Sequence, residues 1–333
     1  MSLRKRTFPY AKADNPVAAA HLLLSLGMWF GALAAGAWLW GNPVGVAVAA
    51  LVFAGGSIRL FGIQHDNGHN SYFTSRRANA ICGVLLGAFT ANAFHTTRLN
   101  HNMHHANLGN LDEMASHEVL TWTVVQWQAA GPWQRLGYRI YRSVPVICFL
   151  GPVLIVFFRY RWPKNLRRAG WWDAVLNNAL MAALWGAVAL VGGWPVFWML
   201  LVGGVTTTTI GGIMVYSGHN HEDTYWQRAG DVNIEEAALK GASVLQLGPV
   251  FDFMTFNFAY HDLHHLNARI PAYRLRACHR SLSDVMTPRA LGLGDALGSL
   301  RWKLWDEEKG RMVRFRDVPQ VDQSQAQGTA SHA

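Results

Sequence analysis

The sequence predicts an all-α integral membrane protein, and three observations support this fold class. Apolar residues make up 51% of the 333 residues, and charged residues make up 15%, whereas a soluble domain usually has about 25%. Two windows, 15–58 and 174–218, contain no Asp, Glu, Lys or Arg. The fifteen tryptophans fit the same class, because indole rings favour the interface between water and lipid.

Each charge-free window is long enough for two membrane helices joined by a tight turn. A window holds about 44 residues, and one helical crossing needs about 20. Asn42-Pro43 interrupts the first window, and Gly193 and Pro195 interrupt the second. We therefore expect two transmembrane helical hairpins, or about four spans. The predicted spans are residues 17–40, 44–64, 174–192 and 195–216.

Two weaker apolar stretches, 78–94 and 140–158, are interrupted by Gly or Pro. We expect them to form interfacial or re-entrant helices, although residues 140–158 are also long enough for a further span. Lys and Arg cluster in the flanks of the windows, at residues 4–6, 76–77 and 159–168, while the turns inside the windows carry no charge. By the positive-inside rule, both ends of each hairpin lie in the cytoplasm.

The predicted organisation is a single membrane domain, residues 15–310, between a cytoplasmic N-terminus at 1–14 and a disordered tail at 311–333. The segments 65–139 and 219–310 hold most of the acidic residues and nearly all the histidines, so they are expected to form a cytoplasmic helical cap. Anionic lipid head groups are the expected partners of the basic runs. Nucleic acid is not expected, because no basic stripe follows a soluble helix.

Tight groups of histidines are the strongest chemical signal. His65 and His69 are spaced i and i+4, so on a helix both side chains share one face. His101, His104 and His105 add the spacing HxxHH, and the same spacing recurs about 160 residues later. The second copy is His261, His264 and His265, and His219 and His221 follow the second hairpin. All these groups lie at the predicted cytoplasmic margin, so they could converge on one metal site.

Alternative metal sites fit the pattern less well. A structural zinc site needs four ligands and usually includes Cys or a carboxylate, whereas eight histidines occupy these three groups. A haem pair would need facing histidines in mid-span, and His21 has no mid-span partner. A soluble di-iron bundle would need Glu and Glu-x-x-His ligands, which are missing. Two irons held by histidine and used to activate oxygen remain, with a non-catalytic membrane metal-binding protein as the competing class.

The histidine groups and their neighbours resemble the three histidine boxes of membrane fatty acid desaturases. Residues 61–73 (FGIQHDNGHNSYF) are similar to the first box, and residues 98–112 (RLNHNMHHANLGNLD) to the second. Residues 216–226 (YSGHNHEDTYW) resemble the stretch with an additional iron-binding histidine, and residues 257–275 (NFAYHDLHHLNARIPAYRL) resemble the third box. The resemblance covers roughly residues 45–285, and it is closest to the bacterial omega-6 (delta-12-type) branch.

The resemblance implies a non-haem di-iron site with O2 as co-substrate, on the cytoplasmic side of a bacterial inner membrane. The implied partners are a fatty acid or fatty acyl substrate and a ferredoxin or rubredoxin with its reductase. The implied iron ligands are His65, His69, His101, His104, His105, His219, His261, His264 and His265. No catalytic residue is predicted beyond these ligands. Candidates for orienting them are Asp66, Glu222 and Asp262, which adjoin histidines, and Asn257, which matches a family asparagine.

The boxes do not separate three outcomes of such chemistry. A desaturase introducing a double bond is the leading prediction, and an oxidative decarboxylase forming a terminal alkene or a hydroxylase are the alternatives. The sequence departs from the family pattern at Asn67, where Cys is usual, and at Thr97, where Trp is usual. His221 is also unusual, and like His95 and His117 it matches no box position. These departures leave the ligands intact, so they concern the product and the substrate more than the metal.

Overall fold

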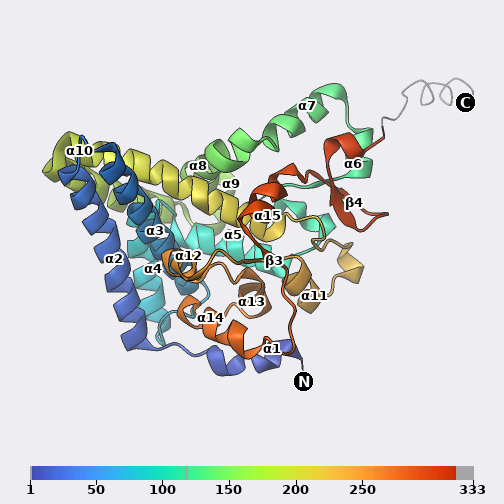
Figure 1. The fold of residues 1–333 in the computed structure, drawn as a ribbon, viewed down its shortest axis with the longest axis horizontal. Helices are drawn as coiled ribbons and strands as arrows, with labels where there is room; N and C mark the ends of the chain where they lie inside the picture. The colour runs from blue at the N-terminus through green and yellow to red at the C-terminus, as the bar shows by residue number, and fades with distance from the viewer. Residues whose placement is uncertain (1, 117–118, 320–333) are drawn as a thin grey trace, which may run out of the picture.

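The computed structural model describes residues 2–116 and 119–319, and most of them are helical (Figure 1). Within these described residues, three helices are long and apolar enough to cross a membrane: α2 (Asn15–Trp38), α3 (Pro43–Gly68) and α10 (Trp171–His219). Asp14 caps α2 by accepting a hydrogen bond from Val17 N, and Asn42 caps α3 by accepting from Val44 N and Gly45 N. The predicted helical class is therefore confirmed.

Helix α10 is 49 residues long, which gives about 74 Å of straight helix, more than twice the thickness of a bilayer core. Gly193 interrupts it with φ 65° and ψ −157°, and Pro195 follows two residues later. This backbone conformation is open to glycine and strained for other residues. The break lies where the sequence predicts the turn between two spans. Two bent helix pairs are also apolar enough to count as broken spans, so composition allows between three and five crossings.

The first bent pair consists of α4 (Arg76–Thr90) and α5 (Phe94–Ala106), whose axes differ by 99°. The second consists of α7 (Pro132–Tyr141) and the segment Val146–Arg161, which contains α8 (Gly151–Phe157), and here the bend is 55°. The other helices are short. They are α1 (Leu3–Arg6), α6 (Val124–Ala129), α9 (Pro163–Ala169), α11 (Ile234–Lys240), α12 (Pro249–Met254), α13 (His261–Leu266), α14 (Ala272–Ser281) and α15 (Leu293–Gly298).

Five short strands in the described part of the chain correct the expectation of a purely helical fold. In one sheet β4 (Leu304–Asp306) lies between β1 (Trp122–Thr123), which is parallel to it, and β5 (Arg311–Val313), which is antiparallel. In the other, β2 (Val244–Leu245) pairs in parallel with β3 (Ala290–Leu291). The predicted start of the disordered tail, residue 311, is therefore too early, because residues 311–313 form β5. Met312 and Val313 are buried in β5, because this strand closes the sheet over α6 and α7. Residues 320–333 lie outside the described residues.

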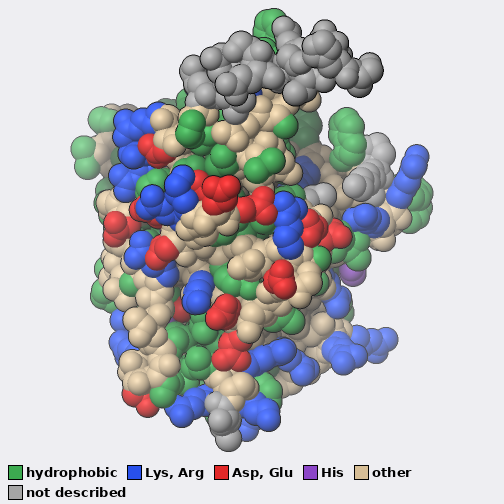
Figure 2. All heavy atoms as spheres, turned by 90° about the vertical axis from the view of Figure 1, so that its right-hand side faces the viewer, with side chains coloured by type: hydrophobic (Ala, Val, Ile, Leu, Met, Phe, Trp, Pro, Cys, Tyr) green, Lys and Arg blue, Asp and Glu red, His purple; other side chains and the backbone are tan. Residues whose placement is uncertain are grey.

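The molecule has an apolar end and a polar end. In Figure 1, α2, α3, α4 and α10 lie together on the left, and most of the short helices lie on the right. The long helices expose large apolar side chains such as Leu23, Val44 and Val191. Lys, Arg, Asp and Glu side chains are spread over the opposite face (Figure 2). This division, together with the length of the helices, indicates association with a membrane.

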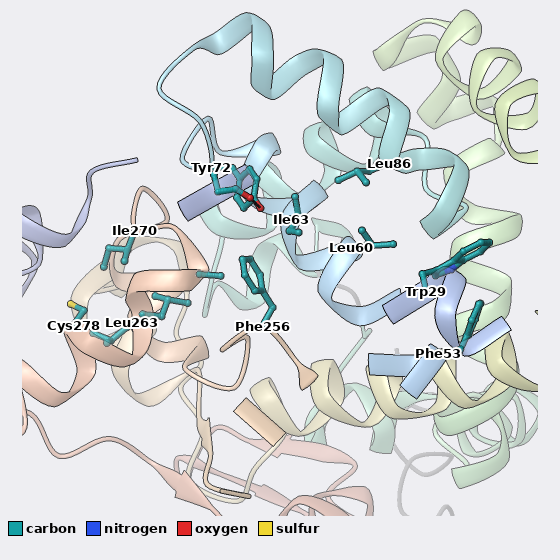
Figure 3. Close-up of a cluster of buried hydrophobic side chains, with 14 of the residues drawn as sticks. Trp29, Phe53, Leu60, Ile63, Tyr72, Leu86, Phe256, Leu263, Ile270 and Cys278 are labelled. Carbon is teal, nitrogen blue, oxygen red and sulfur yellow. Dashed lines mark hydrogen bonds between the residues drawn. The ribbon is translucent and has the colours of Figure 1, made fainter. Parts of the chain in front are cut away.

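The largest of the hydrophobic clusters among the described residues connects the two ends (Figure 3). It runs from Trp29 and Phe53 on α2 and α3 to Leu263 and Cys278 on α13 and α14. Small residues allow this close packing, since a side chain at Gly203 would overlap the ring of Phe53. The core therefore packs the last turns of α3, through Leu60 and Ile63, together with α13 and α14, and both α3 and α13 carry histidines.

Candidate metal centre

Four elements bring the nine predicted histidine ligands together. His65 and His69 lie at the end of α3, and the second box occupies the last two turns of α5. His219 ends α10, and the third box forms most of α13. The i, i+3 and i+4 spacing places the histidines of each box on one side of their helix, so a local sequence pattern accounts for the inward direction of the rings.

The rings form two adjacent groups. In the first group the ligand atoms of His65, His69, His101, His105 and His264 all lie within 4.8 Å of one another. In the second group those of His104, His219 and His265 do the same. The Nε2 atom of His261 lies 2.9 Å from Nε2 of His219 and 3.0 Å from Nε2 of His265, so this ring belongs with the second group.

The nitrogens that face one another fit a cationic metal. In the first group, the Nε2 atoms of four rings follow one another at short distances. Nε2 of His105 lies 3.0 Å from Nε2 of His264 and 2.9 Å from Nε2 of His101. Nε2 of His101 also lies 2.7 Å from Nε2 of His65. One N–H can satisfy one such pair, but in a chain of neutral rings most Nε2 atoms would present lone pairs to each other. Metal ions placed between the rings would accept those lone pairs. All-imidazole donor sets suit iron, copper, nickel and zinc.

Burial keeps the third-box histidines neutral. It lowers the pKa of His261, His264 and His265 well below 6.5, and the neighbouring histidines lower it further. A neutral imidazole has the free lone pair that a metal requires, so these side chains are ready to bind at neutral pH. Burial raises the pKa of the Asp262 carboxyl to about 7.

Hydrogen bonds to the outer nitrogens orient two of the predicted ligands. Nδ1 of His219 lies 2.9 Å from the carbonyl oxygen of Gly241, and Nδ1 of His65 lies 3.4 Å from Oδ1 of Asp66. The other carboxylate oxygen of Asp66 accepts a hydrogen bond from Ala272 N at 2.7 Å. An imidazole that donates through Nδ1 presents the lone pair of Nε2 to a metal, so these contacts select the tautomer that faces the cluster.

The other three candidate orienting residues do not contact a ligand side chain through a recorded hydrogen bond. Asp262 is buried and accepts from Leu263 N. Asn257 donates to the carbonyl oxygen of Ala272. Glu222 has a partly exposed side chain and pairs with Arg311, 3.3 Å away.

Of His95, His117 and His221, which match no box position, His221 is buried, and its Nε2 lies 2.9 Å from the carbonyl oxygen of Lys240. It is not part of either group of ligand atoms. His95 is exposed at the start of α5, and His117 lies outside the described residues.

Asp173 is a residue of the site that the sequence patterns did not reveal. From the first turn of α10, its carboxylate accepts hydrogen bonds from His95 N, Thr96 N and Thr96 Oγ1 at 2.8–3.2 Å. It thus caps the N-terminus of α5, the helix that carries the second box, and this terminus otherwise has no side-chain cap. A single acidic residue immediately before a charge-free window is the signal that could have identified it.

A long apolar cavity of about 460 Å³ reaches the histidine cluster. His65, His69, His101, His104, His219 and His261 line one part of it. A stripe along α10, from Leu200 and Gly204 through Thr208 and Gly212 to Val215, lines the rest together with side chains of α3 and α8. Leu200 is 19 residues from His219, which corresponds to about 28 Å along the helix. Long, flexible and apolar ligands are the molecules that such a cavity can hold.

The comparisons with known proteins agree with this site. The sequence profile of the fatty acid desaturase family matches residues 42–294. A fatty acid desaturase of Bacillus subtilis (strain 168) is 32% identical over 281 residues, covering 83% of this chain and 79% of the relative. An sn-1 oleoyl-lipid 12-desaturase of Anabaena variabilis is 24% identical over 288 residues, covering 82% and 77%.

A third relative, the sn-1 acyl-lipid omega-3 desaturase (ferredoxin) of Synechocystis sp. (strain ATCC 27184 / PCC 6803 / Kazusa), is 25% identical over 250 residues, covering 68% of this chain and 64% of the relative. The fold and the site define a membrane-associated protein that has a buried histidine cluster, suited to metal ions, beside an apolar cavity. The chain belongs to the fatty acid desaturase family. The resemblance of its histidine boxes to that family, including the delta-12 type, is therefore confirmed.

Proposed function

We propose that this protein is an O2-dependent, non-haem di-iron desaturase that introduces a double bond into a fatty acid or fatty acyl chain. One observation carries the proposal: nine imidazoles face one another where they meet an apolar cavity of about 460 Å³. The nitrogens supply two adjacent positions for iron, and the cavity supplies a site for a hydrocarbon chain.

The two groups of histidines would each hold one iron. His65, His69, His101, His105 and His264 would hold the first, and His104, His219, His261 and His265 the second. When bound, the irons supply the oxygen activation needed to attack an unactivated C–H bond. The reaction converts two neighbouring methylenes, O2, two electrons and two protons into an alkene and two waters.

The protein's own residues position the chain and keep its surroundings dry. Phe61, Phe258 and Val215 line the cavity near the histidines, so water has few hydrogen-bonding partners beside the bound chain. Asp66 and the Gly241 carbonyl oxygen hold the outer nitrogens of His65 and His219. These contacts fix the ring orientations before substrate arrives.

The two electrons come from a separate donor. One relative is named as a ferredoxin-dependent desaturase, and we assign reduced ferredoxin or rubredoxin, kept reduced by its reductase, as the donor class for this chain. We further propose four membrane spans in a bacterial inner membrane, with the histidine cluster on the cytoplasmic side. The basic runs that flank the apolar windows support this orientation.

The test combines metal analysis with product analysis. Protein purified in detergent is assayed for iron, then supplied with O2, reduced ferredoxin and saturated fatty acids, thioesters or phospholipids. Two irons per chain and an internal double bond support the proposal. A terminal alkene shorter by one carbon would indicate a decarboxylase, and an alcohol a hydroxylase. Zinc alone with no oxygen uptake would indicate a non-catalytic metal-binding protein.

A matched pair of variants tests the ligand assignment. His219→Ala removes a ring that faces the cluster, and we expect loss of iron from the second position together with loss of product. His221→Ala is the control, because His221 is also buried in the same segment but binds the Lys240 carbonyl oxygen instead. The control variant is expected to keep both irons. Equal iron loss in the two variants would contradict the assignment.

A further inference from the structure

The turn that precedes the third histidine box has a strained backbone. Phe256 and Asn257 have φ values of 56° and 57°, in the left-handed region. Asn tolerates this region, but a bulky aromatic residue rarely adopts it. Two further non-glycine residues with positive φ also flank the site, since Asn70 follows His69 and Ala91 lines the cavity. Backbone strain of this kind persists where the surrounding structure enforces it, and it gathers at functional sites.

The strained turn directs the next side chain, Phe258, against the ligands. Its ring centroid lies 4.8 Å from that of His65, with the two rings nearly perpendicular. It lies 5.6 Å from the ring of His261 and 6.0 Å from that of His264. Phe258 therefore contacts a ligand from the first box and two ligands from the third. It also lines the apolar cavity, where it is the aromatic side chain in contact with both groups of histidines.

Contacts with α3 hold the turn in place. Gly62 allows the close approach, because a Cβ atom there would lie 3.2 Å from Phe256 and 3.7 Å from Phe258. The guanidinium of Arg59 donates a hydrogen bond to the carbonyl oxygen of Phe253 and lies 5.1 Å from the Phe256 ring centroid. In Figure 3 the Phe256 ring lies between Ile63 of α3 and Leu263 of α13.

Contacts within the third-box segment complete the support. The backbone nitrogen of Asn257 donates to the carbonyl oxygen of Asp252 at 2.7 Å, and its side chain donates to the carbonyl oxygen of Ala272 at 3.0 Å. The turn is thus fixed from α3, α12 and the start of α14. A backbone held from three sides leaves the Phe258 ring little freedom to move away from the histidines.

We infer that Phe258 is a specificity-determining residue that selects which carbons of the bound chain lie against the metal centre. This inference rests on the proposed function. The ring lines the cavity beside His65 and His261, which line it too, so a chain bound against these histidines lies next to the ring. Its size and position then set how closely each methylene approaches the cluster. One methylene more or less in a hydrophobic pocket alters selectivity by about 10- to 200-fold.

The experiment compares Phe258→Leu and Phe258→Trp with the control Phe89→Leu. Phe89 lines the same cavity but packs against Trp29 and Phe30, away from the histidines. Each purified variant is assayed for iron and for the positional isomers formed from one saturated chain, together with any hydroxylated by-product. We expect the ratio of positional isomers to shift by about tenfold in the Phe258 variants, with iron content unchanged, and by less than about twofold in the control.

Two results would overturn the inference. One is a wild-type isomer ratio in both Phe258 variants. The other is loss of iron from both, which would give the ring a purely structural role in supporting the cluster. Failure of the proposed function is a separate result, because in that case the wild-type protein itself would form no oxidised acyl product.

Discussion

Arg142 connects four separate segments behind the second group of histidines, and its removal gives a measurable loss of stability. The side chain is completely buried at the end of α7. Its guanidinium donates to the carbonyl oxygens of Leu120 and Trp302 at 3.0 Å and to Thr121 Oγ1 at 3.1 Å. It also donates to the Tyr216 hydroxyl at 3.0 Å and to Asn220 Oδ1 at 2.7 Å. The last two residues flank His219 on the chain.

The magnitude follows from the acceptors that Arg142→Met would leave without a donor. The Trp302 carbonyl oxygen keeps hydrogen bonds from the Tyr216 hydroxyl and from Asn220 Nδ2, and Tyr216 still donates. The Leu120 carbonyl oxygen and Asn220 Oδ1 lose the hydrogen bonds that the guanidinium donates to them. Each buried unsatisfied acceptor costs about 1–3 kcal/mol, so the two acceptors should lower the free energy of unfolding of the variant by about 2–6 kcal/mol.

Urea unfolding of the metal-free protein in mild detergent, followed by near-ultraviolet circular dichroism, measures this difference. Iron retention gives a second readout, because Asn220 directly follows His219. Arg139→Met is the control, since Arg139 is exposed on the same helix and stacks on Trp127 and Phe315. Its loss should cost about 0.5–1 kcal/mol. An Arg142→Met protein as stable as wild type would refute the reasoning, because the cost of burying the cation would then equal the benefit of its hydrogen bonds.

Three further predictions concern the second box, the cavity and pH. Asp173→Ala removes the cap of α5 and should lower the free energy of unfolding by about 1–2 kcal/mol in the same urea assay. Gly204→Leu places a side chain in the cavity, where a Cβ atom meets nothing within 4 Å, so products from the longest chains should fall relative to those from shorter ones in mass-spectrometric analysis. Acid should destabilise the metal-free protein, because the lowered pKa values of the three α13 histidines mean that the unfolded chain alone binds their protons below pH 6.5. Asp262, with a pKa of about 7, binds one more proton in the folded state than in the unfolded state, so α13 contributes a net loss of roughly 2 kcal/mol of stability per pH unit between pH 6 and 5, measured as a lower urea midpoint.

Patterns that depend on neighbours along the chain were readable from the sequence. The charge-free windows correspond to α2, α3 and α10, because a membrane helix needs a long apolar run and little else. The interruption at Gly193 follows from the local Gly-Gly-Trp-Pro sequence. The histidine spacing determines which side of each helix carries the rings, so the membership of each box could be predicted residue by residue.

Features made by distant segments could not be predicted in the same way. Glu222 and Asp66 both adjoin a histidine in the sequence, yet only Asp66 lies beside a ligand ring, whereas Glu222 meets Arg311, 89 residues away. The cap that Asp173 gives to α5 joins residues 77 and 78 positions apart. β5 is buried only because β4 precedes it and β1 lies beyond. Local periodicity contains no information about such pairings, since tertiary packing decides them.

The residues that can direct the product are those that line the cavity beside the ligands, and this criterion separates the unusual residues of the histidine boxes. Asn67 is buried and donates to the Ile63 carbonyl oxygen inside α3, so its side chain does not line the cavity. His221 contacts the Lys240 carbonyl oxygen and is likewise absent from the cavity wall. Thr97 lines the cavity one turn before His101, where the small side chain leaves space that a tryptophan would fill. Thr97 and Phe258 therefore both line the cavity near the histidines, one from α5 and the other from the third-box segment, whereas Asn67 and His221 do not.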